Sequence, residues 1–229
     1  KTMNTEKAGK TGIIFDMDGT LWDSSRQVAD AWSTVTVPRL GQAVTQEDMY
    51  RTMGMPMDEL AKAIFPEHEL SELLPVMEES CRVENEYLAE HGAELYPGLI
   101  ETIRQLSADY PLYIASNCQT GYIEAFLSYY QIGQYFEDHI CFGTNGRPKG
   151  ENIALLMERN GITRGIYVGD IQADYDAAVQ GGAEFIHAAY GFGTVREPVP
   201  RLHAFSQLPQ LLRSRFAVSA GSFRGCSNT

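Results

Sequence analysis

Several features are scarce in this sequence, and their scarcity excludes whole classes of protein. No stretch approaches the roughly 18 uninterrupted apolar residues that a membrane-spanning helix needs, and no apolar signal segment stands near the start. Only four cysteines are present, scattered without the spacing of a zinc site: Cys81, Cys118, Cys141 and Cys226. Such usage is typical of reduced thiols, so we expect a soluble, cytoplasmic protein with no membrane partner.

Positive charge is also scarce. Lys and Arg total 18 against 30 Asp and Glu, which gives a formal net charge of -12. Nucleic-acid binding depends on Lys and Arg neutralising phosphates, so we expect no nucleic-acid partner. Only 5 residues are lysines, and Lys62 and Lys149 are the two that lie beyond the first ten positions. A phosphorylated ligand would therefore depend on local groups, such as a metal, a lysine or helix N-termini.

The pattern of the 229-residue chain indicates one core interrupted by an insert. The apolar run from Thr11 to Asp16 predicts a buried strand. From about Ser24 to Glu94 charged and apolar residues alternate at helical spacing, with breaks at Gly54–Met57 and Phe65-Pro66. Beyond Tyr96 strand-like and helix-like segments alternate, which predicts a parallel sheet with helices on both faces. The expected strands are 112–115, 139–142, 165–168 and 184–187, and the expected helices are 99–108, 122–130, 151–160 and 174–180.

We therefore expect an α/β fold, with a Rossmann-like three-layer core around a parallel sheet and a small, inserted, all-helical domain. The core would comprise residues 11–23 and 96–212, and the helical insert residues 24–95, with terminal segments at 1–10 and 213–229. Sheets of this kind bind ligands beyond the carboxyl ends of their strands. Polar residues at those ends are thus the candidates for chemistry.

Two aspartates, Asp16 and Asp18, end the first predicted strand and are followed at once by Gly19 and Thr20. Carboxylates this close repel each other and are costly to remove from water unless a cation or a shared proton compensates. Phosphate chemistry with a divalent metal explains the pair best. An isolated sequence of this kind is more often a polar turn, so the interpretation depends on the rest of the chain.

Three further polar clusters follow the same logic. Ser116-Asn117 follows one predicted strand, Asp170 and Asp174 follow another, and Lys149 opens a predicted helix. A parallel sheet would gather such residues at one edge. Taken singly, each has a plainer structural explanation: Ser116 as a helix N-cap, Lys149 as a solvated helix-start residue, and Asp170 and Asp174 as capping acids.

In this order, the four clusters resemble the motifs of the haloacid-dehalogenase-like (HAD) phosphohydrolase superfamily. That family has a DxDGT-type motif, a hydroxyl residue after the second strand, a distant lysine and a GDxxxD-type motif, and this chain matches all four. The resemblance covers nearly the whole chain, and the insert looks like the small helical cap of the family. The loop Ala189–Gly193 resembles one found in the phosphoglycolate-phosphatase-like branch. The chain as a whole resembles the phosphoglycolate phosphatase / β-phosphoglucomutase-like branch with a helical cap.

The resemblance implies a Mg²⁺-dependent phosphatase acting on a small phosphoglycolate-like or sugar-phosphate-like metabolite. Asp16 would be the nucleophile that forms an aspartyl-phosphate, and Asp18 the general acid and base. Mg²⁺ would be bound by Asp16, the Asp18 carbonyl and Asp170, with Asp174 in support. Thr20 would also orient Asp18 or the adjoining turn. The expected phosphate-binding residues are Ser116, Asn117, Lys149, Gly19 and Thr20.

Substrate identity would be encoded in the cap. The loop Met53–Met57 resembles the one that capped members turn toward the active site, which makes Met55 a candidate for substrate contact. Cap cations could bind a second anionic group, although a surface role is commoner for any one of them. Segments near 23–25 and 95–98 should act as hinges. The candidate cations are Arg26, Arg51, Lys62 and Arg82.

Two alternative functions stay open. A β-phosphoglucomutase-type phosphomutase shares the fold and the motifs, although the pair Gly19-Thr20 is more typical of the phosphatase branch. A non-enzymatic phospho-receiver or binding module also combines acidic residues, a hydroxyl and a lysine on an α/β sheet, but receivers lack a long helical insert. The oligomeric state and the role of the basic C-terminal tail do not follow from the sequence.

Overall fold

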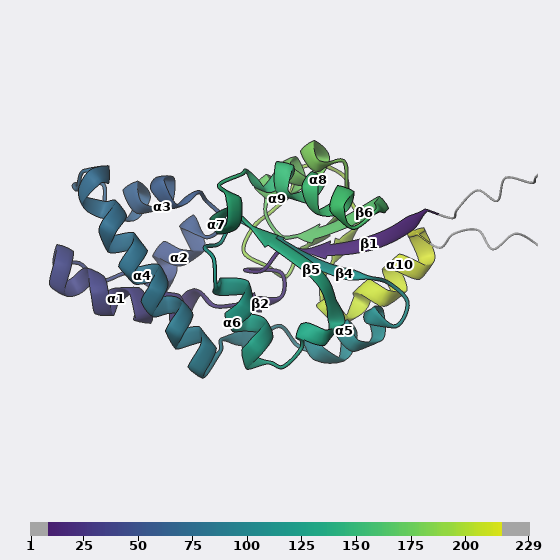
Figure 1. Cartoon of the computed structure of the whole chain (residues 1–229), viewed down its shortest axis with the longest axis horizontal. Helices are drawn as coiled ribbons and strands as arrows, with labels where there is room; N and C mark the ends of the chain where they lie inside the picture. The colour runs from purple at the N-terminus through teal and green to yellow at the C-terminus, as the bar shows by residue number, and fades with distance from the viewer. Residues whose placement is uncertain (1–8, 217–229) are drawn as a thin grey trace, which may run out of the picture.

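The computed structural model describes residues 9–216, in which a six-stranded parallel sheet is covered by helices (Figure 1). The strand order is β5-β4-β1-β6-β7-β8, and every neighbouring pair runs parallel. The expected α/β fold is thereby confirmed. The strands are β1 (Lys10–Phe15), β4 (Leu112–Ser116), β5 (Phe136–Cys141), β6 (Ile162–Gly169), β7 (Glu184–Ala188) and β8 (Arg201–Leu202).

The sheet is buried on both faces, as its near-continuous apolar strands predict. In β1, Ile13 and Phe15 belong to one hydrophobic cluster and Ile14 to the other, because successive side chains alternate between faces. Three layers result, as expected. One face packs against α5 (Leu99–Ser107), α6 (Tyr122–Tyr129) and α10 (Leu208–Phe216), and the other against α8 (Lys149–Arg159) and α9 (Gln172–Gly181).

The strand order reverses direction at β1. From β1 the chain builds outward to β4 and β5 on one side, and then to β6, β7 and β8 on the other. The carboxyl ends of β4, β1 and β6 are therefore neighbours at a topological switch point, where open α/β sheets bind their ligands. This placement brings the predicted polar clusters to a single edge of the sheet.

An all-helical segment is inserted between β2 (Trp22–Asp23) and β3 (Glu94–Leu95), as predicted. These two short strands pair antiparallel, so the chain leaves the sheet domain and returns to it at adjacent positions. In Figure 1 the inserted helices lie together at the end of the molecule opposite α10. They are α1 (Ser25–Leu40), α2 (Gln46–Thr52), α3 (Met57–Ile64) and α4 (Leu70–His91).

The helix boundaries in the insert follow local chemistry. Thr45 caps α2 by accepting a hydrogen bond from the Asp48 N–H at 3.1 Å, while the Asp48 carboxylate accepts from the Thr45 N–H at 3.0 Å. Pro56 lies directly before α3, where its missing N–H costs no helical hydrogen bond. Phe65-Pro66 follows α3, as the sequence pattern indicates.

Some details differ from the sequence prediction. Strand β5 starts at Phe136 rather than 139, and Phe142 begins the short helix α7 (Phe142–Asn145) instead of ending the strand. Helix α10 continues to Phe216, past the boundary expected at 212. Residues 217–229, including Cys226 and most of the expected tail, lie outside the described residues. Cys81, Cys118 and Cys141 are free thiols. Within residues 9–216, none of the helices has the length and apolarity needed to cross a membrane.

Candidate active site

A tight turn follows β1 and fixes the first motif. The Met17 carbonyl accepts hydrogen bonds from the N–H groups of Thr20 at 3.1 Å and Leu21 at 2.8 Å. Gly19 has φ +80°, and a Cβ there would lie 2.1 Å from Oδ2 of Asp170. Both the left-handed backbone and the closeness of Asp170 require glycine at this position.

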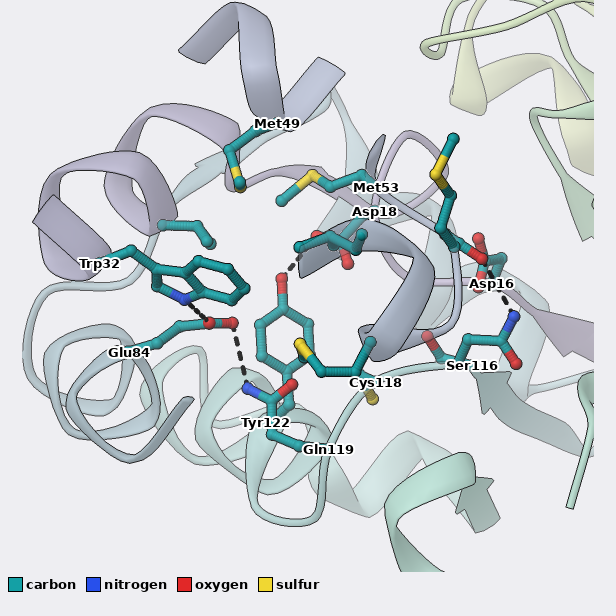
Figure 2. Close-up of a pocket in the computed structure, with 16 residues that line it drawn as sticks. Asp16, Asp18, Trp32, Met49, Met53, Glu84, Ser116, Cys118, Gln119 and Tyr122 are labelled. Atoms are coloured by element: carbon teal, nitrogen blue, oxygen red, sulfur yellow. Dashed lines mark hydrogen bonds between the residues drawn. The ribbon is translucent and has the colours of Figure 1, made fainter. Parts of the chain in front are cut away.

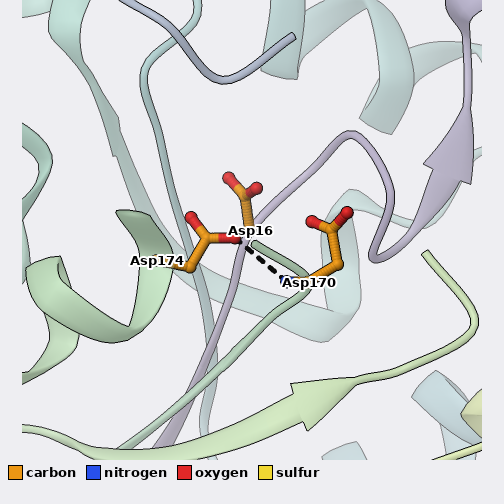
Figure 3. Close-up of side chains that lie close together, drawn as sticks. All are labelled: Asp16, Asp170 and Asp174. Atoms are coloured by element: carbon orange, nitrogen blue, oxygen red, sulfur yellow. Dashed lines mark hydrogen bonds between the residues drawn. The ribbon is translucent and has the colours of Figure 1, made fainter. Parts of the chain in front are cut away.

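Three aspartates converge beside this turn. Asp16 follows β1, Asp170 follows β6 and Asp174 lies in the first turn of α9, and each offers a carboxylate oxygen within 4.8 Å of the others (Figure 3). All three side chains are buried. Oxygen-only ligands of this kind suit a hard divalent cation such as Mg²⁺. This buried aspartate cluster therefore indicates a metal site.

The electrostatics of the cluster agree with that assignment. Burial and the charge of Asp174 raise the pKa of Asp16 to about 7, and burial with the charges of Asp174 and Asp16 raises the pKa of Asp170 well above its usual range. Lys149 supplies one positive charge against three carboxylates. If all three ionise, two negative charges remain, which is the charge that one divalent cation balances.

Lys149 bridges two of these carboxylates. Its Nζ donates hydrogen bonds to Oδ1 of Asp16 at 2.9 Å and to Oδ1 of Asp174 at 2.7 Å. The lysine is the first residue of α8 and is only 5% exposed, so its interpretation as a solvated helix-start residue is wrong. Burial lowers the pKa of Lys149, but the two carboxylates outweigh this effect and raise that pKa well above its usual value.

Asp174 combines a structural role with its place in the cluster. Its Oδ2 accepts hydrogen bonds from the N–H groups of Asp170 at 3.0 Å and Ile171 at 3.2 Å, which caps the start of α9. The capping explanation is thus correct for Asp174. Because Oδ1 meets Lys149, both carboxylate oxygens of Asp174 are fixed in position.

Asp18 lies in a different environment from Asp16. Its Oδ1 accepts hydrogen bonds from the hydroxyls of Ser24 at 2.7 Å and Tyr122 at 2.5 Å. Burial raises the pKa of Asp18, while the hydrogen bonds from Tyr122 and Ser24 act in the opposite direction. Two carboxylates one residue apart therefore have separate partners, which is what different chemical roles require. Ser24 and Tyr122 were not predicted from the sequence as partners of Asp18.

The second motif provides a hydroxyl and a contact to the insert. Ser116 ends β4 and is 5% exposed, beside the same cavity as Asp16. It does not cap the next helix, because α6 begins at Tyr122 with Gly121 as its N-cap, so that explanation is wrong. Nδ2 of Asn117 donates a 3.1 Å hydrogen bond to the Gly54 carbonyl in the loop between α2 and α3.

Thr20 and the loop 189–193 support Asp170. The Thr20 hydroxyl lies 3.5 Å from Oδ1 of Asp170, so it contacts this aspartate rather than Asp18, while its N–H closes the adjoining turn as expected. The Phe192 N–H donates to Oδ2 of Asp170 at 2.7 Å. A Cβ on Gly191 would lie 2.2 Å from the Gly19 carbonyl oxygen, so this loop packs directly on the first motif.

A cavity of about 60 Å³ opens beside Asp16 and Asp18, between the sheet edge and the insert (Figure 2). The core contributes polar side chains, and the insert contributes a mostly apolar wall. Such a cavity suits a small ligand fixed by a few polar groups. Its lining residues are Asp16, Asp18, Ser116, Asn117, Cys118, Gln119 and Tyr122 from the core, and Val28, Trp32, Met49, Met53, Gly54, Met55, Met57, Leu60 and Glu84 from the insert.

The three candidate substrate residues differ in their position relative to the cavity. Met55 lines the cavity, as proposed from its loop. Arg51 is exposed, pairs with Asp48 at 2.5 Å and lines a neighbouring cavity of about 540 Å³ that also contacts Lys149. Arg26 is exposed on α1 and lines neither of these two cavities. None of the described residues that line the cavity beside Asp18 is a lysine or an arginine.

Comparison with known proteins identifies the family. Residues 13–188 match the family described as haloacid dehalogenase-like hydrolase. A phosphoglycolate phosphatase from Photobacterium profundum is 29% identical over 220 residues, which cover 88% of this chain and 95% of that protein. A phosphoglycolate phosphatase from Escherichia coli (strain K12) is 25% identical over 209 residues, which cover 79% and 82% of the two chains.

Solved structures share the fold. A haloacid dehalogenase-like family hydrolase from Streptococcus pneumoniae superposes with a TM-score of 0.71 at 22% identity, covering 89% of this chain and 98% of that one. A structure from Haemophilus somnus, described as a predicted phosphoglycolate phosphatase, gives a TM-score of 0.72 at 21% identity, covering 90% and 99%. The family resemblance drawn from the motifs is confirmed. The two curated relatives described above are phosphoglycolate phosphatases, and the chain belongs to the haloacid dehalogenase-like hydrolase family.

Proposed function

We propose that this chain is a Mg²⁺-dependent phosphatase that hydrolyses a small phosphorylated metabolite through an aspartyl-phosphate on Asp16. The observation that carries the proposal is the contrast between two neighbouring carboxylates. Asp16 lies against Lys149 in the buried aspartate cluster, whereas Asp18 is bound separately by Ser24 and Tyr122 at the same cavity. A nucleophile and an acid/base need such different surroundings.

In the first step, the Asp16 carboxylate attacks phosphorus, and the bond between phosphorus and the leaving oxygen breaks. Asp18, whose pKa is raised by burial, delivers its proton to that oxygen. Lys149 and Ser116 bind the phosphoryl oxygens, together with backbone N–H groups near Gly19 and Asn117. The product alcohol leaves, and the phosphoryl group stays on Asp16.

In the second step, a water molecule attacks the aspartyl-phosphate. The ionised Asp18 takes a proton from that water, and the hydroxyls of Tyr122 and Ser24 stabilise its charge. Inorganic phosphate is released, and Asp16 is regenerated. Mg²⁺, when bound, would neutralise phosphoryl charge; Asp16, Asp170 and the Asp18 carbonyl would hold it, with Asp174 in support.

The inserted helices would act as a cap over this chemistry. We assign residues 24–95 to the cap and residues 11–23 and 96–212 to the catalytic core, with hinges near 23–25 and 95–98. The hydrogen bond from Asn117 of the second motif to the Gly54 carbonyl connects the proposed core to the proposed cap. Closure would exclude water from the aspartyl-phosphate until the alcohol has left.

The test is phosphate release from a panel of phosphomonoesters in the presence of Mg²⁺. We expect multiple turnovers by the wild type and none by Asp16→Asn. Asp176→Asn, which changes an exposed aspartate on α9, should retain activity. Absence of release from every ester contradicts the proposal, and one equivalent of phosphorylated protein without turnover favours a phospho-receiver. Conversion of a sugar phosphate into its isomer instead favours the mutase.

A further inference from the structure

The cavity beside Asp18 contains a carboxyl group that the proposed mechanism does not use. Glu84, from α4 in the insert, is 4% exposed and lines this cavity. Its Oε2 accepts a hydrogen bond from Trp32 Nε1, and its Oε1 accepts one from Gln119 Nε2 at 3.1 Å (Figure 2). Both donors are neutral, so they satisfy the oxygens without balancing a charge.

Ionising a buried carboxyl that has only neutral partners costs free energy, and the pKa of Glu84 reflects this cost. Burial raises the pKa of Glu84 to about 8. Among residues 9–216, no ion pair found in the structure involves Glu84. An apolar or amide side chain at this position would avoid the cost of burying an acid. The position of the carboxyl on a cavity wall therefore points to a ligand group that compensates it.

The rest of that wall rejects a second anion. Around Glu84 the insert presents Trp32, Leu60 and several methionines, and none of the described lining residues is a lysine or an arginine. A carboxylate on the leaving group would enter an apolar cavity whose lining offers it no positive charge. Removing a carboxylate from water without a partner of opposite charge is strongly unfavourable.

A positively charged group on the leaving group would be favoured in the same cavity. An ammonium group could pair with the Glu84 carboxylate and contact the rings of Trp32 and Tyr122, which line the same cavity. Aromatic rings and a carboxylate are the usual means by which proteins bind ammonium groups. The cavity beside Asp18 is small, about 60 Å³, which suits a short leaving group.

We propose, building on the phosphatase function above, that the substrate is the phosphate monoester of a small amino alcohol, and that Glu84 binds its ammonium group against Trp32 and Tyr122. Glu84 is then a specificity-determining residue, while Asp16 and Asp18 carry out the reaction. The cavity selects for a positive charge at the end of the leaving group and against a negative one.

Three two-carbon phosphates test the proposal because they differ mainly in the charge of their far end: 2-aminoethyl phosphate, 2-hydroxyethyl phosphate and phosphoglycolate. For the wild type we expect kcat/KM to fall in that order, with the amine ahead of the neutral alcohol by about tenfold or more. Glu84→Gln should remove the advantage of the amine while leaving the neutral ester within a fewfold of its wild-type value. Glu86→Gln, which changes an exposed glutamate on α4, should preserve the order.

A binding measurement complements the kinetics. Trp32 contacts Glu84, so its fluorescence should respond to ethanolamine added with inorganic phosphate, saturably in the wild type and not in Glu84→Gln. Phosphoglycolate as the best of the three substrates, or an order that Glu84→Gln leaves unchanged, overturns the proposal without touching the phosphatase function. If no ester of any kind releases phosphate, the phosphatase function fails, and the fluorescence titration decides this proposal alone: ethanolamine binding that depends on Glu84 supports it, and no such binding overturns it.

Discussion

The hydroxyl of Tyr122 donates a 2.5 Å hydrogen bond to Oδ1 of Asp18, although 104 residues separate the two in sequence. The same hydroxyl lies 2.8 Å from that of Ser24, which also bonds to Asp18. Helix α6 of the core and the start of the insert thus meet at one carboxylate oxygen. The acid/base residue of the proposed mechanism is oriented by both parts of the molecule.

Replacing Tyr122 by Phe removes one donor to the ionised form of Asp18. The pKa of Asp18 should rise further. The basic limb of the pH–rate profile, along which Asp18 loses the proton that it delivers in the first step, should therefore move to higher pH. We expect kcat to fall about tenfold or more, the usual cost of a hydrogen bond to a charged group. Tyr129→Phe, an exposed change on the same helix, serves as the control and should leave the profile in place. An unchanged basic limb in Tyr122→Phe would assign the tyrosine to packing alone.

Replacing Lys149 by Met removes the only ammonium group that bonds to Asp16 and Asp174 within the described residues. Leaving a buried carboxylate unpaired typically costs about 3–5 kcal/mol, so urea denaturation in EDTA should show a marked loss in the free energy of unfolding. Activity should fall by about a hundredfold or more. Lys62→Met changes an exposed lysine and should alter neither quantity strongly. A Lys149→Met protein of wild-type stability would contradict the charge balance inferred for the cluster.

Mg²⁺ should stabilise the folded protein against heat, because a ligand that binds only the native state raises its melting temperature. Asp170→Asn removes one carboxylate of the cluster and should abolish most of this increase. Asp176→Asn, two residues beyond Asp174 and exposed, should keep it. The comparison needs only thermal scans with Mg²⁺ and with EDTA. An equal increase in all three proteins would place the cation outside the aspartate cluster.

Glu84 should make stability depend on pH in a defined direction. Its pKa rises from an ordinary value of 4.5 to about 8 in the folded protein. Between these values the folded state retains a proton that the unfolded chain has lost, so the contribution of Glu84 to stability falls as the pH rises. Glu84→Gln does not titrate, and its melting temperature relative to the wild type should therefore increase from about pH 5 to about pH 9. The difference should stay constant with pH in Glu86→Gln.

Alanine substitutions at two glycines distinguish the effect of backbone strain from the effect of a steric clash. Gly19 has φ +80°, and a Cβ there would lie 2.1 Å from Asp170, whereas Gly161 has φ +64° and nothing within 4 Å of its Cβ position. Both alanine variants should lose stability, by about 1–2 kcal/mol from strain alone. Gly19→Ala should in addition lose Mg²⁺ stabilisation and phosphate release, while Gly161→Ala retains both. Wild-type activity in Gly19→Ala would contradict the tight packing of the first motif on Asp170.

The sequence was sufficient to predict which residues meet at the sheet edge. Asp16, Ser116 and Asp170 all follow buried apolar runs, and a parallel sheet places the ends of such runs side by side. Lys149 was identified by its rarity and its motif, but its burial depends on α8 packing against the sheet. Local pattern alone favoured a solvated lysine there, and the charges of Asp16 and Asp174 explain why burial prevails.

Other contacts could not be predicted from the sequence pattern. Tyr122 and Glu84 sit on helices whose apolar spacing shows only that one face is buried, not what that face meets. Their partners are distant in sequence: Asp18 for Tyr122, and Trp32 and Gln119 for Glu84. Strand β8 was not predicted from the sequence, for a different reason. Its two residues are too few for alternation to be recognised, and it forms because β7 offers an open edge.

The short pairing of β2 with β3 has a consequence for how the chain folds and varies. Asp23 lies opposite Glu94, so the two ends of the long helical excursion are joined at its base. The inserted helices therefore form a closed loop whose two ends are fixed beside the sheet. The entropy cost of closing a loop grows only with the logarithm of its length. Helices can therefore be lengthened, lost or replaced there without changing the register of a single strand in the sheet. One reaction centre can in this way be combined with many different ligand-binding walls.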